Sequence, residues 1–349
     1  MFLKALLALT LSTTIIAPLH AADVTDSAGR TVPVPATVTK VFPAGPPASI
    51  FLYMLAPDLM AGWPRLPRED ERALIPAPYD ALPEVGRLTG RGGSANLETV
   101  LAIKPDLILD YGSMKPTYIS LAGRVQEQTG IPYAIIDGTF ENIPAAIRTV
   151  GKLIGRTNEL EPKAREAERI MEKLAAAKAQ VPLNKAPRVY YGRGADGLQT
   201  GVGNAINIEL LKYAGAVNVA EETASSGNLA SVSMEQVLKW QPDVILTTDP
   251  NFYDLVWDHP VWSTLKAVNQ GKVYLSPTIP FGWFDRPPSA NRLIGLHWLL
   301  AVLYPDTFGD DLENETRRFY KTFYHLDLTD RQLKTVLGPG TRPGSGKSR

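Results

Sequence analysis

The chain has 349 residues, with 36 basic and 36 acidic side chains and no cysteine. This length exceeds one ordinary hydrophobic core and suits two lobes of about 130–150 residues each. Because the charges cancel, no overall field favours nucleic acid or an anionic membrane. The missing cysteines exclude disulfides, thiolate chemistry and a lipid anchor on cysteine.

Residues 1–21 are predicted to be a secretory signal peptide. Met1–Lys4 is short and basic, Ala5–Ala17 is apolar, and Leu19-His20-Ala21 offers a small-residue cleavage site. The apolar run is too short to span a bilayer. We therefore expect cleavage near Ala21 and a soluble exported protein, located in the periplasm of a Gram-negative cell. The alternative is a buried N-terminal helix.

Residues 22–156 are predicted to form a first lobe in which strands alternate with helices. Two loops interrupt the pattern: the proline-rich excursion Trp63–Glu84 and the glycine-rich segment Gly86–Ser94. The expected elements are a hairpin at Asp23–Pro35, strands at Thr37–Phe42, Leu59–Trp63 and Pro132–Ile136, and helices at Ala48–Leu55, before Thr129 and at Asn142–Ile154.

One segment of the chain occurs twice. Asn96–Asp110 (NLETVLAIKPDLILD) and Ser233–Thr247 (SMEQVLKWQPDVILT) share E-x-V-L-x-x-x-P-D-[LV]-I-L without a gap. In each copy a polar first residue can N-cap a short helix, and a proline ends that helix. The apolar run that follows predicts a strand buried on both faces. The repeat therefore predicts two similar α/β lobes.

A long helix is predicted between the two copies. It is expected to start at about Glu159–Pro162, with the proline in its first turn, and to end near Gln180. An apolar stripe of Ala164, Ala167, Met171 and Leu174 faces inward. About 20 helical residues span about 30 Å, enough to join the lobes, so we assign 157–181 as an interlobe helix. An ordinary packing helix within one lobe is the alternative.

Residues 182–337 are predicted to form the second lobe, followed by a disordered tail over 338–349. The tail contains Gly, Pro, Ser and basic residues without apolar periodicity. The expected elements are strands at Arg188–Tyr191 and Lys272–Leu275, helices at Ala205–Ala214, around Pro260-Val261-Trp262, at Ala290–Leu303 and at Leu312–Phe323, and a long loop at Ser276–Ser289.

The chain resembles the cluster A (class III) periplasmic substrate-binding proteins of ABC importers for ferric siderophores, haem and cobalamin. The resemblance rests on the paired units, on Val24–Pro35 (VTDSAGRTVPVP) and on His259–Tyr274. It implies an α/β fold of two Rossmann-like lobes joined by a single long backbone helix. It also implies that Glu98 and Glu235 pair with arginines of an inner-membrane permease dimer. The alternative is that each glutamate only stabilises its own helix through the dipole.

A ligand is expected between the lobes, outside the carboxyl ends of the strands. Pro280–Ser289 combines three aromatic rings with an arginine, which suits a bulky, partly aromatic anion. For each candidate the alternative is a structural role, such as an Asp285–Arg286 ion pair. The candidates are Trp63, Arg65, Arg91 and Tyr111 in the first lobe, and Tyr191, Arg193, Phe281, Trp283, Phe284, Asp285 and Arg286 in the second.

Motifs for catalysis or for a bare metal ion are missing from the sequence. Thr200–Ile206 (TGVGNAI) has Ile206 where a dinucleotide loop needs its third glycine. His259, His297 and His325 are far apart, which argues against a protein-only metal site, and His297 is expected to pack within a helix. No nucleophile–base pair is evident.

We therefore expect a monomer without enzymatic activity, resident cofactor or nucleic-acid partner. Its expected function is to capture a ferric siderophore and deliver this iron chelate to an ABC importer. Haem, for which the cleft offers tyrosines, cobalamin and an oxyanion such as molybdate are alternative ligands. An exported α/β enzyme is the alternative class.

Overall fold

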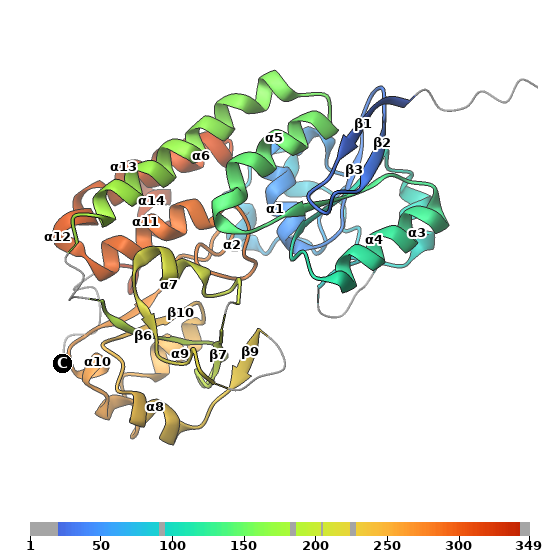
Figure 1. The fold of residues 1–349 in the computed structure, drawn as a ribbon. Helices are drawn as coiled ribbons and strands as arrows, with labels where there is room; N and C mark the ends of the chain where they lie inside the picture. Colours follow the sequence, from blue (N-terminus) through green and yellow to red (C-terminus); the bar gives the residue numbers. More distant parts are fainter. Residues whose placement is uncertain (1–19, 91–94, 182–185, 204, 224–227, 343–349) are drawn as a thin grey trace, which may run out of the picture.

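The computed structural model describes residues 20–90, 95–181, 186–203, 205–223 and 228–342, which fold as a mixed α/β protein (Figure 1). Residues 1–19, most of the predicted signal peptide, lie outside this range, as does Arg91. Across the described residues no helix is long and apolar enough to cross a membrane.

The N-terminal lobe is built on a parallel sheet with the strand order β3-β4-β5. An isolated parallel bridge between Val41 and Met60 adds a fourth position beside β3. The strand predicted at Leu59–Trp63 is not formed: a 3₁₀ turn ends at Leu59, and only the bridge at Met60 continues the sheet. The strands are β3 (Val41–Pro43), β4 (Leu107–Gly112) and β5 (Tyr133–Asp137). They are almost fully buried, as expected for parallel strands covered by helices.

The C-terminal lobe is built on a second parallel sheet with the order β11-β10-β6-β8. Its strands are β6 (Arg188–Gly192), β8 (Val217–Asn218), β10 (Val244–Thr247) and β11 (Val273–Leu275). If the strands of each lobe are numbered along the chain, with the bridge at Met60 as the second of the N-terminal lobe, their order across the sheet is 2-1-3-4 in both lobes. The two lobes therefore share one topology, as the repeat predicted.

Helices and two small two-stranded antiparallel sheets complete the fold (Figure 1). One is the hairpin of β1 (His20–Thr25) and β2 (Thr31–Pro35), and the other pairs β7 (Gln199–Gly201) with β9 (Leu229–Ser231). The N-terminal half contains α1 (Pro46–Leu55), α2 (Glu69–Arg72), α3 (Leu97–Ile103), α4 (Pro116–Thr129), α5 (Ile143–Leu153) and α6 (Thr157–Lys178). The C-terminal half contains α7 (Glu209–Ala214), α8 (Met234–Trp240), α9 (Pro250–Leu255), α10 (Lys266–Asn269), α11 (Arg292–Leu303), α12 (Pro305–Phe308), α13 (Leu312–Phe323) and α14 (Asp330–Val336).

The two copies of the repeat occupy equivalent places, forming α3 and β4 in one lobe and α8 and β10 in the other. The predicted N-caps are confirmed. Asn96 Oδ1 accepts the N–H of Thr99 at 2.8 Å, and Ser233 Oγ accepts the N–H of Gln236 at 3.3 Å. Each helix ends in a left-handed residue directly before the proline.

The aspartates of the repeat hold the neighbouring strand. Asp106 Oδ2 accepts the backbone N–H groups of Thr39 (2.7 Å) and Lys40 (2.9 Å), just before β3. Asp243 Oδ2 accepts the N–H of Arg188 (3.1 Å), the first residue of β6. The equivalent aspartate of each repeat therefore positions the first strand of its own parallel sheet.

Helix α6 packs on α5 of the N-terminal lobe and on α11 of the C-terminal half. Ion pairs connect it to both halves of the chain: Glu161 pairs with Arg148 of α5 at 2.9 Å, and Arg169 pairs with Glu315 of α13 at 2.9 Å. The helix begins at Thr157, the first residue of the assigned range and two residues before Glu159, so Pro162 lies in its second turn rather than in its first.

The two lobes share one continuous hydrophobic core. Its buried residues run from β4 through α1, α5, α6 and α11 to Leu246 in β10. The segment after α13 also packs on α1: Tyr53 Oη donates to the carbonyl of Tyr324 at 2.8 Å, and His325 Nε2 lies 3.0 Å from the carbonyl of Tyr53. Contacts between the lobes are therefore not limited to α6.

The prediction of disorder from residue 338 onward is wrong for residues 338–342. The N–H of Leu275 donates to the carbonyl of Gly340 at 2.9 Å, and Trp298 Nε1 donates to the carbonyl of Thr341 at 2.8 Å. Backbone carbonyls rather than apolar side chains make these contacts. A search for apolar periodicity could therefore not detect them.

Candidate ligand-binding site

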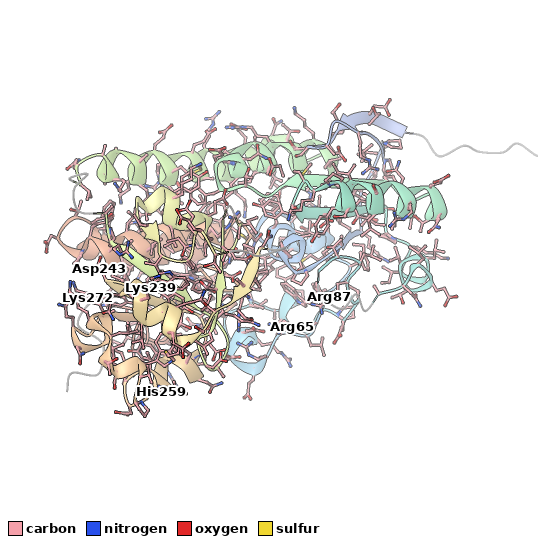
Figure 2. All side chains as sticks on the ribbon, turned by 60° about the horizontal axis from the view of Figure 1, so that its bottom comes forward. Arg65, Arg87, Lys239, Asp243, His259 and Lys272 are labelled. Carbon is pink, nitrogen blue, oxygen red and sulfur yellow. The ribbon has the colours of Figure 1, made fainter. Side chains whose placement is uncertain are left out.

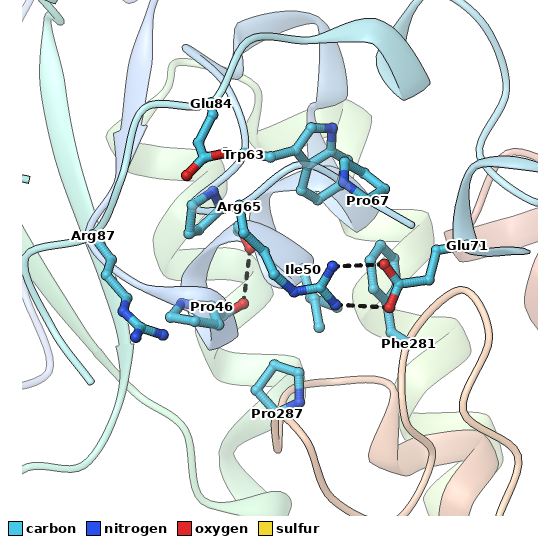
Figure 3. A pocket seen from close by; sticks show the side chains of 12 residues that line it. Pro46, Ile50, Trp63, Arg65, Pro67, Glu71, Glu84, Arg87, Phe281 and Pro287 are labelled. Carbon is cyan, nitrogen blue, oxygen red and sulfur yellow. Dashed lines mark hydrogen bonds and ion pairs between the residues drawn. The ribbon is translucent and has the colours of Figure 1, made fainter. Parts of the chain in front are cut away.

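A cavity of about 270 Å³ lies where the N-terminal lobe meets the loop Ser276–Ser289 of the C-terminal lobe (Figure 3). Pro46, Ser49 and Ile50 line it from the first turns of α1, which follows β3 directly. Phe281 and Pro287 line it from the other lobe. The cavity therefore lies at the carboxyl end of the first sheet, where ligands of open α/β sheets bind.

Two of the predicted aromatic residues meet at this cavity. The ring centroids of Trp63 and Phe281 are 5.8 Å apart, and both rings also contact Tyr53 of α1. Trp63 is fixed because its Nε1–H donates to the carbonyl of Tyr79 at 2.8 Å. These rings form an apolar wall to which both lobes contribute.

Arg65 lines the cavity and is held by Glu71 (Figure 3). Its Nη1 and Nη2 donate to the two carboxylate oxygens at 2.8 and 2.7 Å. The buried Glu71 also accepts the N–H of Arg68 at 2.8 Å. This hydrogen-bonded pair raises the pKa of Arg65, and Glu71 balances its charge, so the pair adds no net charge to the cavity.

Arg87 is a lining residue that the sequence analysis missed. It lies in the glycine-rich loop four residues before Arg91. Figure 3 shows it at the cavity with Arg65, and Figure 2 shows these two labelled arginines near each other on the whole molecule. The N–H groups of Leu88 (2.7 Å) and Thr89 (2.9 Å) donate to the carbonyl of Ala44, which holds the loop against the start of α1. The sequence did offer one indication of this residue, because Arg87 and Arg91 lie in the same glycine-rich loop, from which only Arg91 was chosen as a candidate.

The cavity lining carries no net charge. The described lining residues include two arginines, Arg65 and Arg87, and two glutamates, Glu71 and Glu84. Discrimination among ligands therefore depends on the placement of hydrogen-bond donors and of the aromatic wall, and not on an overall positive field.

Asp110 lies beneath the glycine-rich loop, near the end of β4. Its carboxylate is 3.3 Å from Thr89 Oγ1 and 3.3 Å from Tyr133 Oη. Burial raises its pKa to about 6, although the N–H of Tyr111 opposes this by donating to it. A buried, titratable carboxyl group thus supports the loop that carries Arg87.

We expect Asp110→Asn to stabilise the protein at neutral pH but not in acid. The pKa of Asp110 is higher in the folded protein (about 6) than the ordinary value of 3.8. The folded state therefore binds this proton more tightly, and stability is lost as the pH rises from about 4 to about 6. The loss is roughly 3 kcal/mol, and asparagine avoids it.

Urea denaturation of both proteins near pH 4 and near pH 8 measures the effect, with the exposed Asp254→Asn as the control. A difference in unfolding free energy that is the same at both pH values would contradict this assignment of the pKa.

Tyr111 and Tyr191 do not line the cavity, contrary to the prediction. β4 continues to Gly112, beyond Asp110, where the repeat unit ends and the strand was expected to end with it, so Tyr111 belongs to the sheet and stacks on Phe51 at 4.2 Å. Tyr191 is fully buried within β6. Burial raises the pKa of both hydroxyls, to about 12 for Tyr111. A strand end misplaced by one or two residues accounts for the error at Tyr111.

Trp283, Phe284 and Asp285 are also buried and do not line the cavity. The loop folds back on itself, with the N–H of Trp283 donating to the carbonyl of Pro277 at 3.0 Å. The contact with α11 is close, because a Cβ on Gly295 would lie 2.0 Å from the carbonyl oxygen of Trp283. These side chains therefore pack in the protein interior and support the loop rather than the ligand.

The two remaining arginines have different carboxylate partners. Arg193 Nε lies 3.3 Å from Asp285, which also accepts hydrogen bonds from Tyr191 Oη (3.0 Å) and Asn207 Nδ2 (2.7 Å). The Arg286 side chain is 42% exposed and lies 3.9 Å from Asp249. The ion pair considered between Asp285 and Arg286 is therefore not formed, and neither arginine lines the cavity.

The described residues contain no group of three or more His, Asp or Glu side chains that could hold a metal ion. His297 is buried in α11, and this burial lowers its pKa to about 4. It therefore packs as a neutral side chain within the helix, as predicted.

Glu98 and Glu235 occupy the second position of α3 and α8 and are exposed. Figure 1 places α3 at the outer edge of the N-terminal lobe and α8 on the side of the C-terminal lobe away from α6. The two carboxylates therefore lie on separate lobes, outside the cavity.

The fold and the interlobe cavity define a two-lobed ligand-binding protein, and comparison with known proteins identifies its family. The family described as "Periplasmic binding protein" matches residues 41–280. The chain therefore belongs to this family and is a cluster A substrate-binding protein of ABC importers.

Among solved structures, an ABC transporter solute binding protein from Sulfurospirillum deleyianum is 29% identical, with a TM-score of 0.82 over 90% of this chain and 98% of that chain. The molybdate-binding protein MolA of Haemophilus influenzae is 27% identical over 68% of this chain and 72% of its own length. The Fe(3+)-citrate-binding protein YfmC of Bacillus subtilis is 26% identical over 53% of this chain and 58% of its own length.

Proposed function

We propose that this protein captures a compact, oxygen-rich metal anion between its lobes and delivers it to the permease dimer of an ABC importer. Molybdate, ferric citrate and, among the ferric siderophores expected from the sequence, the compact anionic ones belong to this class. The cavity that both lobes line, with Arg65 and Arg87 beside the Trp63–Phe281 wall, supports the proposal. In this role the protein acts as a periplasmic monomer without catalysis or a resident cofactor.

The size of the cavity favours a compact ligand. Sites for drug-sized ligands are about 300–1,000 Å³, and this cavity measures about 270 Å³. Cobalamin, haem and the larger ferric siderophores exceed such a volume unless the lobes move apart. The names of two relatives, a molybdate-binding and a ferric-citrate-binding protein, agree with a compact oxygen-rich species.

A thermal-shift panel tests the proposed ligand class. The probes are sodium molybdate, ferric citrate, a ferric catecholate siderophore, which is an anion, haemin and cyanocobalamin. A ligand at about 100 times its Kd stabilises the folded state by ~2.7 kcal/mol, so one of the first three should raise the melting temperature. Stabilisation by haemin or cyanocobalamin alone, or by none of the five, would overturn the proposal.

Arg87→Ala is expected to weaken binding of the stabilising probe by roughly 10- to 150-fold. A hydrogen bond to a charged group contributes about 1.5–3 kcal/mol, and each 1.4 kcal/mol is about tenfold in Kd. Titration calorimetry measures the change, with Arg286→Ala as the matched control because that side chain lies outside the cavity. Equal losses in both variants would argue against a specific role of Arg87.

Helix α6 is proposed to act as a rigid strut, so that the lobes close only slightly on the ligand. The shared core and the ion pairs from α6 to α5 and α13 oppose a large hinge motion. We expect X-ray scattering to show little change in radius of gyration when the stabilising probe is added. A large compaction would show that α6 does not fix the distance between the lobes.

A further inference from the structure

A lysine of α6 joins the ends of two helices that belong to different halves of the chain. Lys163 lies in the second turn of α6, and its Nζ donates to the carbonyls of Met54 (2.6 Å) and Thr322 (2.9 Å). Met54 is the last residue but one of α1, and Thr322 is the last but one of α13. Carbonyls at a helix C-terminus lack partners within the helix and carry the negative end of its dipole, so an ammonium group suits both places.

The surroundings of Lys163 make this side chain more than a packing residue. Burial lowers the pKa of its ammonium group to about 8, and Glu159, one turn earlier in α6, only partly opposes this. The ring of Phe323 lies 5.9 Å from Nζ and adds a contact with the end of α13. An apolar side chain of the same length would fill this place without the cost of burying a charge. The lysine therefore contributes its two directed bonds.

Helix α1 has the ligand cavity at its other end. Pro46, Ser49 and Ile50, in its first two turns, line the cavity. A helix of ten residues is about 15 Å long and moves as one rigid element. A displacement of its C-terminal end, where Lys163 binds, therefore also displaces the residues that line the cavity.

The aromatic wall of the cavity depends on the same two helix ends. The ring of Tyr53 in α1 contacts Trp63 (5.5 Å between centroids) and Phe281 (5.6 Å). The ring of Tyr324, just after α13, lies 5.4 Å from that of Phe281. Both tyrosines are within two residues of the carbonyls that Lys163 bonds. The wall is thus supported from both sides of this lysine.

We propose that Lys163 is a positioning residue of the ligand site, which holds the first turns of α1 and the Trp63–Phe281 wall in one arrangement by bonding the ends of α1 and α13. It acts through these helices, because it does not itself line the cavity. Without the ammonium group two carbonyls lose a donor, and the two helix ends are free to shift apart. The inference rests on the proposed function and gives α6 a part in shaping the site.

Lys163→Met tests the inference, because it removes the ammonium group and keeps a long side chain. The probe is whichever of sodium molybdate, ferric citrate and the ferric catecholate stabilises the protein. By titration calorimetry we expect its Kd to rise by roughly tenfold, equivalent to the loss of one directed contact. Lys163→Gln, whose shorter amide does not reach both carbonyls, should show the same rise and serves if the methionine variant does not fold. The control Lys173→Met removes a lysine of α6 that pairs with Asp311 and Glu315 and should keep the affinity.

Chemical rescue separates the ammonium group from the packing around it. Since the chain has no cysteine, Lys163→Cys introduces a single thiol. Its thiolate displaces bromide from 2-bromoethylamine in the unfolded protein, which gives a cationic side chain of the same length as lysine. Bromopropane gives a neutral one of the same shape. After refolding, the aminoethyl form should bind the probe within about twofold of wild-type protein carried through the same steps, and the propyl form should not.

Three outcomes would overturn the inference. If Lys163→Met keeps the Kd within about twofold while Arg87→Ala weakens binding, Lys163 has only a structural role and the proposed function stands. If the aminoethyl and propyl forms bind equally well, packing and not the ammonium group matters at this position. If no probe binds the wild-type protein, the proposed function fails and the inference fails with it.

Discussion

Replacing Glu98 and Glu235 together with alanine is expected to abolish uptake while leaving ligand affinity nearly unchanged. Both carboxylates are exposed on separate lobes and lie outside the cavity. The N-caps of their helices are made by Asn96 and Ser233, so both helices should persist without the glutamates and lose only weak surface interactions such as that with the helix dipole. Uptake in cells and calorimetry on the purified protein separate the two effects.

The matched control is Glu127→Ala with Asp254→Ala, which removes one exposed carboxylate from each lobe outside the repeat. That control should transport normally, because only the charges of the repeat are placed for docking. Loss of ligand binding in the Glu98 and Glu235 double variant, with uptake reduced in proportion, would contradict the docking role.

The second large effect is expected at Arg292. Its side chain is fully buried between the lobes: Nη1 donates to Glu209 at 2.5 Å, Nη2 donates to the carbonyl of Gly138, and Nε donates to the carbonyl of Ser289 at 3.1 Å. Glu209 in turn accepts the N–H of Phe140 at 3.2 Å. A single ion pair of the C-terminal half thus holds the loop after β5 in the N-terminal lobe.

Arg292→Met is therefore expected to lower the free energy of unfolding by about 3–5 kcal/mol, because it leaves a largely buried carboxylate without its partner. Urea denaturation measures the loss. Arg292→Met combined with Glu209→Leu should recover part of it, since no charge then stays unpaired. A loss below about 1 kcal/mol for the single variant would show that Arg292 is not important for joining the lobes.

The candidate site could be predicted only in part from the sequence. The sequence located Trp63, Arg65 and Phe281, all of which line the cavity. It selected Arg91, which lies outside the described residues, and overlooked Arg87 in the same loop. It also assigned Trp283 and Phe284 to the ligand, whereas both are buried under their own loop. Residue type suggested the chemistry, but not which side chains face the cavity.

The features that the sequence determined by itself depend on neighbouring residues. A capping side chain, a proline and an apolar run lie within fifteen residues in each repeat, and together they define a helix–turn–strand unit. Two such units without a gap in their alignment predicted two similar lobes, and both sheets have the same strand order.

The features that only the tertiary structure decided depend on residues far apart in the chain. Arg292 meets Gly138, Tyr53 meets Tyr324, and Leu275 meets Gly340. These contacts join the lobes and order residues 338–342, and no local pattern encodes them. They form because a buried polar group must find a partner, and the packing of the whole chain determines which partner is within reach.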